Sequence, residues 1–131
     1  MKVFKRVSML ICVVSVVTLF SMTVLATANT TLCFPYNVKD GDDASTSYTN
    51  TTSQPLTVEV KTTPDVVGGI VKVEINKYNP RTDAGIIASQ YFPYSPVVPP
   101  ISFNLPAQTT YYVYISTYLS TYVSGILEVS Y

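Results

Sequence analysis

The chain has 131 residues, with eight acidic and eight basic residues, so its formal net charge is zero. It contains no histidine and no tryptophan. The lack of histidine excludes Ser-His-Asp and Cys-His catalysis and the usual zinc sites.

The first 28 residues have the layout of a secretory signal peptide. Lys2, Lys5 and Arg6 precede an apolar run over 7–25, and the small-x-small segment 26–28 follows it. A basic region, an apolar region and a small-residue cleavage site predict export and cleavage before Asn29. The alternative is an uncleaved membrane anchor, because the apolar run is just long enough to cross a bilayer. Serines and threonines dilute that run, and we favour cleavage and a secreted, extracellular protein.

The segment 29–131 is the size of one domain with one hydrophobic core. Without the three basic residues of the leader, the chain has five basic and eight acidic residues, which gives a net charge of −3. The basic residues are Lys39, Lys61, Lys72, Lys77 and Arg81. Their scatter forms no basic patch, so we expect neither a nucleic-acid partner nor attachment to an anionic membrane once the leader is removed.

Two cysteines are present, Cys12 in the leader and Cys33 after it. Cleavage would leave Cys33 as the single cysteine of the mature chain. We expect a buried thiol in the core, where unpaired cysteine is common; the alternative is a disulfide to another chain.

Eight short strands are expected along 29–131, because apolar and polar residues alternate between clusters of turn residues. Leu56 to Lys61 is the clearest case. The expected ranges are 33–38, 45–49, 56–62, 70–78, 86–92, 101–105, 110–118 and 124–130. The turn at 79–85 predicts a hairpin, and the prolines from Pro93 onward predict an edge strand. Short connections favour an antiparallel, all-β sandwich that is jelly-roll-like.

Tyrosines are concentrated near the end of the chain. In a strand starting at Tyr111, alternation places Tyr112 and Tyr114, and beyond them Tyr118, on the face opposite the core. An outward row of tyrosines could bind carbohydrate or a protein partner at the cell surface. The alternative is cross-strand packing that stabilises the sheet.

An acidic run, Asp40, Asp42 and Asp43 around a glycine, is the weak candidate for a metal site. Its carboxylate oxygens would suit Ca²⁺, but the run lacks the length and terminal Glu of an EF-hand loop. A solvated turn explains the same residues, so we expect no cofactor. The sequons at Asn29 and Asn50 are acceptors only in a host that glycosylates such motifs.

Glu59, Glu74 and Glu128 are the remaining acid/base candidates, and alternation predicts that all three face solvent. No nucleophile and base can be paired from the sequence, so we expect a protein that is not an enzyme. A hydrolase would need two of these carboxylates at glycosidase spacing in a cleft.

The end of the chain, Phe103 to Ile115 followed by Gly125 to Tyr131, resembles the closing strands of bacterial pre-peptidase C-terminal-type domains. The chain departs from that pattern at Gln108, where glycine is usual, and at 72–78, which replaces an acidic strand. The resemblance implies a jelly-roll-like sandwich with an accessory role and transfers no calcium ligand. The whole chain is also similar in style to short secreted proteins of Gram-positive bacteria.

Two functions follow as hypotheses. The first is a secreted, non-catalytic binding or accessory module that uses its surface tyrosines. The second is a self-assembling structural subunit of a cell-surface fibre or matrix, in which the polar segment Asn29 to Leu32 pairs with a neighbouring sheet. Deletion of residues 29–38 should then abolish assembly.

Overall fold

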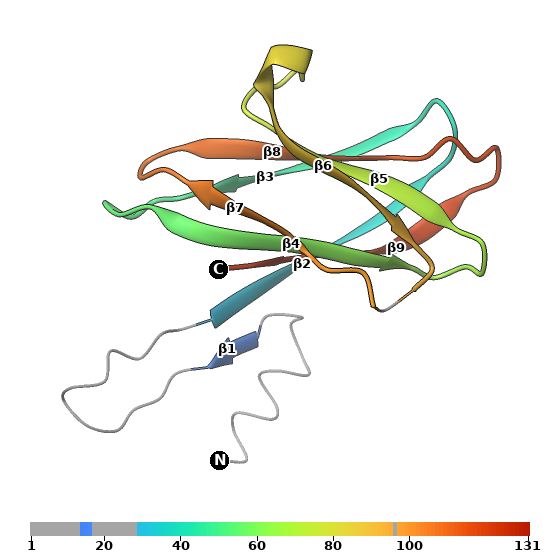
Figure 1. The fold of residues 1–131 in the computed structure, drawn as a ribbon, viewed down its shortest axis with the longest axis horizontal. Coiled ribbons are helices and arrows are strands. Elements are labelled where there is room, and N and C mark those ends of the chain that lie inside the picture. Colours follow the sequence, from blue (N-terminus) through green and yellow to red (C-terminus); the bar gives the residue numbers. More distant parts are fainter. Residues whose placement is uncertain (1–13, 17–28, 96) are drawn as a thin grey trace.

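The computed structural model describes residues 14–16, 29–95 and 97–131, which form two antiparallel β-sheets packed face to face (Figure 1). We name them sheet A, in the order β1-β2-β9-β4-β7, and sheet B, in the order β3-β8-β5-β6. The strands are β1 (Val14–Val16), β2 (Asn29–Val38), β3 (Asp43–Thr49), β4 (Leu56–Pro64), β5 (Ile70–Asn76), β6 (Ile86–Pro93), β7 (Ile101–Leu105), β8 (Thr110–Ser116) and β9 (Val123–Ser130). A 3-10 turn, η1 (Asp83–Gly85), precedes β6.

The eight expected strands correspond one to one with β2–β9, which confirms the antiparallel β-sandwich. The alternation that predicted β4 is also its burial pattern, since Val58 and Val60 are buried and Glu59 is exposed. The strand β1 pairs with only the first three residues of β2. Most of the expected signal peptide, and with it the question of an anchor, lies outside the described residues.

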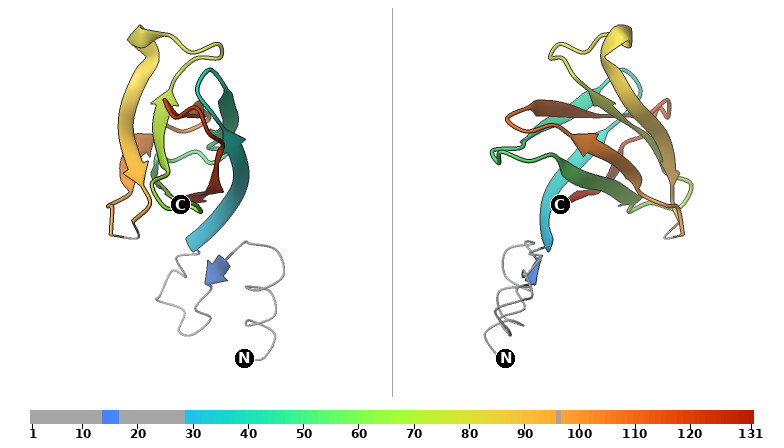
Figure 2. Two further views of the ribbon diagram at one scale, coloured as in Figure 1. Left: turned by 90° about the vertical axis from the view of Figure 1, so that its right-hand side faces the viewer. Right: turned by 60° about the vertical axis from the view of Figure 1, so that its left-hand side comes forward.

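Only one connection between successive strands of the β2–β9 sandwich is a hairpin. β5 and β6 are hydrogen-bonded neighbours, as the turn at 79–85 predicted, while every other connection crosses from one sheet to the other. β6 is an edge strand, as Pro93 and the prolines after it predicted. Figure 2 shows β2 and β3 along one side of the sandwich and β6 and β7 along the other.

The core lies between the two sheets and is mostly β-branched and aromatic. The largest fully buried side chains come from both sheets: Phe92, Ile75, Leu105, Leu127 and eight valines. At about 25 cal/mol per Å² of buried apolar surface, these side chains are the main source of stability.

One buried hydroxyl pair in this interior links β2 to β4 across the strand between them, β9. The Thr62 hydroxyl donates to the Ile126 carbonyl (2.7 Å), so Tyr36 donates its own proton to Thr62 (2.9 Å). A Cβ at Gly125 would collide with the Tyr36 ring and hydroxyl, which explains glycine at this position.

No helix in the described part of the chain is long and apolar enough to cross a membrane.

Candidate functional site

The predicted tyrosine face is the outer face of sheet B, the side turned away from the core. Tyr112 and Tyr114 do lie on it, opposite Ser47 and Ser45 of β3. The loop between β5 and β6 folds back over part of this face. Tyr114 is therefore only 7% exposed, so its predicted place on the outer face is confirmed but the expectation that it is open to a ligand is wrong.

The loop is held by Tyr114 itself. The Tyr114 hydroxyl shares its proton between the Tyr78 carbonyl (3.1 Å) and Asn79 Oδ1 (3.0 Å). Arg81 lies over the Tyr114 ring, 5.1 Å from its centre, and pairs with Asp43 at 3.0 Å. Tyr114 is thus a structural contact between β8 and the loop.

Glu74 lies on the same outer face but is buried, so the prediction that it faces solvent is wrong. Its carboxylate accepts a hydrogen bond from Asn76 (3.1 Å) and lies 3.7 Å from the Lys72 ammonium. Asn76 also donates to the Thr82 carbonyl (2.8 Å) and accepts from the Tyr78 amide (3.0 Å). Glu74 and Asn76 therefore support the base of the hairpin loop.

Tyr118 is 62% exposed and meets a partner that the sequence did not suggest, Tyr91 of β6. The ring centres are 6.3 Å apart and the planes are inclined at 65°. Tyr91 lies opposite Lys72 in the register of β6 with β5. We call Tyr91 and Tyr118 the tyrosine pair.

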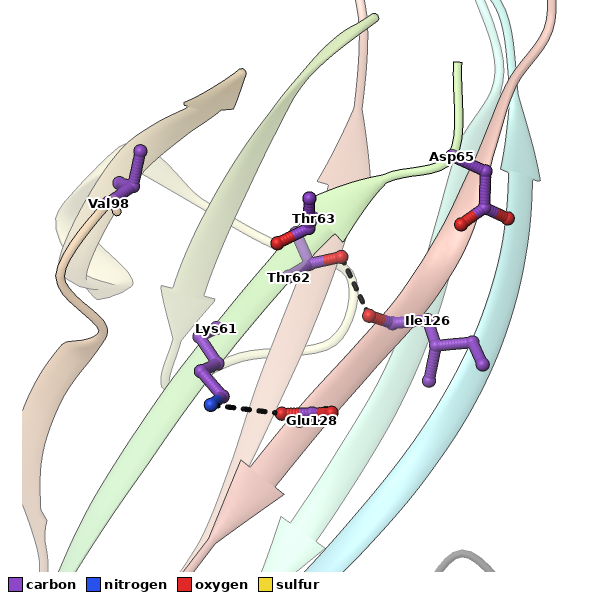
Figure 3. A pocket seen from close by; sticks show the side chains of 7 residues that line it. All are labelled: Lys61, Thr62, Thr63, Asp65, Val98, Ile126 and Glu128. Atoms are coloured by element: carbon purple, nitrogen blue, oxygen red, sulfur yellow. Dashed lines mark hydrogen bonds and ion pairs between the residues drawn. The ribbon is translucent and has the colours of Figure 1, made fainter. Parts of the chain in front are cut away.

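The outer face of sheet A carries a different feature, a shallow hollow of about 270 Å³ (Figure 3). β4 and β9 form its floor, where Lys61 and Glu128 form an ion pair at 3.3 Å. Val98, from the loop between β6 and β7, and the exposed Ile126 add apolar surface. Asp65 lies at the far end (Figure 3).

The three glutamates do not converge. Glu59 and Glu128 share the outer face of sheet A, whereas Glu74 lies on that of sheet B. Glu59 lines a second open hollow of about 450 Å³ together with Thr31, Thr57, Ser130 and Tyr131. Glu128 is engaged by Lys61.

The acidic run forms the turn between β2 and β3. Gly41 has a φ of +88°, which glycine adopts without strain, and the Asp42 amide donates to the Lys39 carbonyl. Asp43 is held by Arg81, and within the described residues no three potential ligands gather as a metal site would need.

Cys33 is not the buried thiol that we expected. It lies on the outward side of β2, half-buried, in register with Glu128, and it is disulfide-bonded. The other cysteine of the chain, Cys12, lies outside the described residues.

The sequon residue Asn50 is wholly buried. Its amide donates to the carbonyls of Gln54 (2.8 Å), Leu105 and Pro106 (both 3.1 Å), and its Oδ1 accepts from Thr52. In the folded domain Asn50 is a structural anchor for the loop after β3 and is inaccessible to modification.

No protein-family model matches the chain, and neither curated proteins nor solved structures gave a match.

Proposed function

We propose that this protein is a non-catalytic binding module that binds a carbohydrate at the tyrosine pair. The observation that carries the proposal is the pair Tyr91 and Tyr118, both at least half exposed and in edge contact. Aromatic rings offer an apolar face and a polar hydroxyl, which together suit the C–H face and the hydroxyls of a sugar.

Polar groups beside the tyrosine pair support this choice of ligand. Lys72 lies next to Tyr91 in the sheet, and its side chain is about one-third exposed. Its ammonium is held near the buried Glu74 carboxylate, which restricts its position. A few fixed polar groups around an aromatic surface are the usual composition of a small-ligand site.

The test is an oligosaccharide array followed by calorimetry on the strongest hit. Tyr118→Ala should weaken binding by roughly tenfold, since a lost aromatic contact is worth about 1 kcal/mol or more. Tyr122→Ala is the matched control, because Tyr122 is 55% exposed in the same loop but lies against Lys39. Equal binding by wild type and Tyr118→Ala would contradict the proposal.

We also propose that the protein is exported and that its domain is a jelly roll with an accessory role. The leader-like residues 1–28 support export. The order β2-β9-β4-β7 over β3-β8-β5-β6, with a single hairpin, agrees with the double-sheet arrangement of two Greek keys.

A structural subunit is the second candidate, but through a different strand from the one we first considered. β2 supplies Tyr36 and Val38 to the core, so deleting 29–38 would damage the fold instead of testing assembly. The observation that favours assembly is an open edge on β3.

A further inference from the structure

β3 is the one strand of the sandwich β2–β9 whose outer edge is both long and unprotected. Sheet edges expose unpaired backbone N–H and C=O groups, and proteins commonly block them with proline, charge or short strands. Apart from β1, which covers only residues 29–31 of β2, the four edges of this sandwich are β2, β7, β3 and β6. They differ in how they are protected.

Two edges are blocked by proline. Thr30 and Tyr131 exchange two hydrogen bonds (2.9 and 3.0 Å), so the even-numbered residues of β2 bond to β9 and Pro35 faces the open side. The Tyr94 amide donates to Gly69 (2.9 Å), so by the same alternation Pro93 faces the open side of β6. Each proline removes one outward N–H.

A third edge, β7, has only five residues and follows Pro99 and Pro100. Its start is also tied to β6, because the side-chain amide of Gln90 donates to the Pro99 carbonyl at 2.8 Å.

β3 has none of these devices. The backbone N–H of Asn50 donates to the Thr109 carbonyl (2.9 Å), so the backbone groups of the even-numbered residues of β3 bond to β8. Alternation therefore directs the backbone groups of four exposed residues outward: Asp43, Ser45, Ser47 and Thr49. The only charge among them, on Asp43, is paired with Arg81.

We propose that β3 pairs antiparallel with β3 of a second copy of this chain, joining two sheets B into one across a two-fold axis. With the axis at Thr46, Ser45 lies opposite Ser47 of the second copy and Asp43 lies opposite Thr49. The outward-directed residues then face one another, so donors meet acceptors, and no like charges are opposed. Such self-complementarity is what an isologous dimer requires.

The pairing of β3 with β3 of a second copy leaves the tyrosine pair uncovered. β6, which carries Tyr91, is the opposite edge of sheet B, and Figure 2 places β6 and β3 on opposite sides of the sandwich. The dimer therefore does not depend on the proposed carbohydrate site.

The test is the mass in solution of the protein expressed from the full chain, by sedimentation from micromolar to near-millimolar concentration. We expect a concentration-dependent dimer. Ser47→Pro removes an outward N–H in each copy and should weaken it by roughly tenfold to a hundredfold, at about 1 kcal/mol per hydrogen bond. Ser89→Pro is the matched control, since Ser89 occupies an outward position on β6.

A pair of double variants tests the register and leaves the backbone donors intact. Ser45→Lys with Ser47→Lys places like charges opposite each other and should yield monomer. Ser45→Lys with Ser47→Glu places opposite charges together and should retain the dimer. A wild-type monomer at all concentrations, a dimer lost on adding reductant, or equal effects of Ser47→Pro and Ser89→Pro would each overturn the proposal.

Discussion

The outer faces of the two sheets differ in how they meet solvent. Sheet B is partly covered by the β5–β6 loop, which buries Tyr114 and Glu74. Sheet A has no comparable cover among the described residues and exposes Ile126 and the Lys61–Glu128 pair. Residues at equivalent outward positions therefore contribute structure on one sheet and solvated surface on the other.

The difference shows that an outward position in a strand is not by itself an exposed position. Alternation specifies which side of the sheet a residue is on, but a loop from elsewhere can bury it. The residues that remain available to a partner beside sheet B lie beyond the loop, at the tyrosine pair.

The largest effect is expected for Tyr114→Ala. Removing this buried ring should lower the free energy of unfolding by about 3 kcal/mol, since a cavity and two lost hydrogen-bond contacts add together. Ile126→Ala is the matched change on sheet A and should cost at most about 0.5 kcal/mol, because Ile126 is exposed. Urea denaturation measures both, and equal losses would show that the two faces do not differ.

Asn76→Ala should cost about 2 kcal/mol, because it removes one hydrogen bond from the Thr82 carbonyl and one from the buried Glu74 carboxylate. The loop over sheet B should also loosen, which hydrogen exchange at the Tyr78 amide would detect. Asn104→Ala, on the outer face of sheet A, is the control; protection at Tyr78 that is unchanged in Asn76→Ala would refute the anchoring role.

Alkaline pH should affect the interior that both sheets share. Burial raises the pKa of Tyr36, and burial followed by the neighbouring Tyr131 raises the pKa of Tyr48, above the ordinary value of 10.0. Above pH 10 the unfolded chain releases the phenol protons of Tyr36 and Tyr48, while the folded state still keeps them. The contribution of these tyrosines to the free energy of unfolding is therefore complete below about pH 10 and is lost as pH rises through their folded-state pKa values. Each pKa unit corresponds to about 1.4 kcal/mol.

Thermal unfolding followed from neutral to alkaline pH measures this loss. Tyr36→Phe is the useful comparison, because Thr62 keeps its bond to Ile126 and one ionising group is removed. The variant should lose less stability than wild type at high pH; parallel curves would show that Tyr36 titrates normally.

The smallest effect is expected for the ion pair on sheet A. Glu128→Gln should change the free energy of unfolding by less than about 0.5 kcal/mol, because the Lys61 and Glu128 side chains are 57% and 41% exposed to solvent. The matched change on sheet B, Glu74→Gln, alters a buried group and should cost more. Denaturation in low and high salt would separate the two, and a large salt-sensitive loss in Glu128→Gln would reverse the order.

The sequence by itself determined the strands. Local alternation, β-branched residues and clusters of turn residues placed all eight strands of the sandwich and the single hairpin, because these signals act between near neighbours in the chain. It also predicted that Tyr112 and Tyr114 share one side of β8.

Only the tertiary structure decided which outward residues reach solvent. Tyr114 is buried by residues 78–81, Glu74 by the same hairpin, and Tyr118 meets Tyr91 from another strand. Asn50, a sequon by pattern, became an anchor because Leu105 and Pro106 pack beside it. These contacts join positions far apart in the chain, so their effects depend on strand order and loop path, which local patterning does not encode.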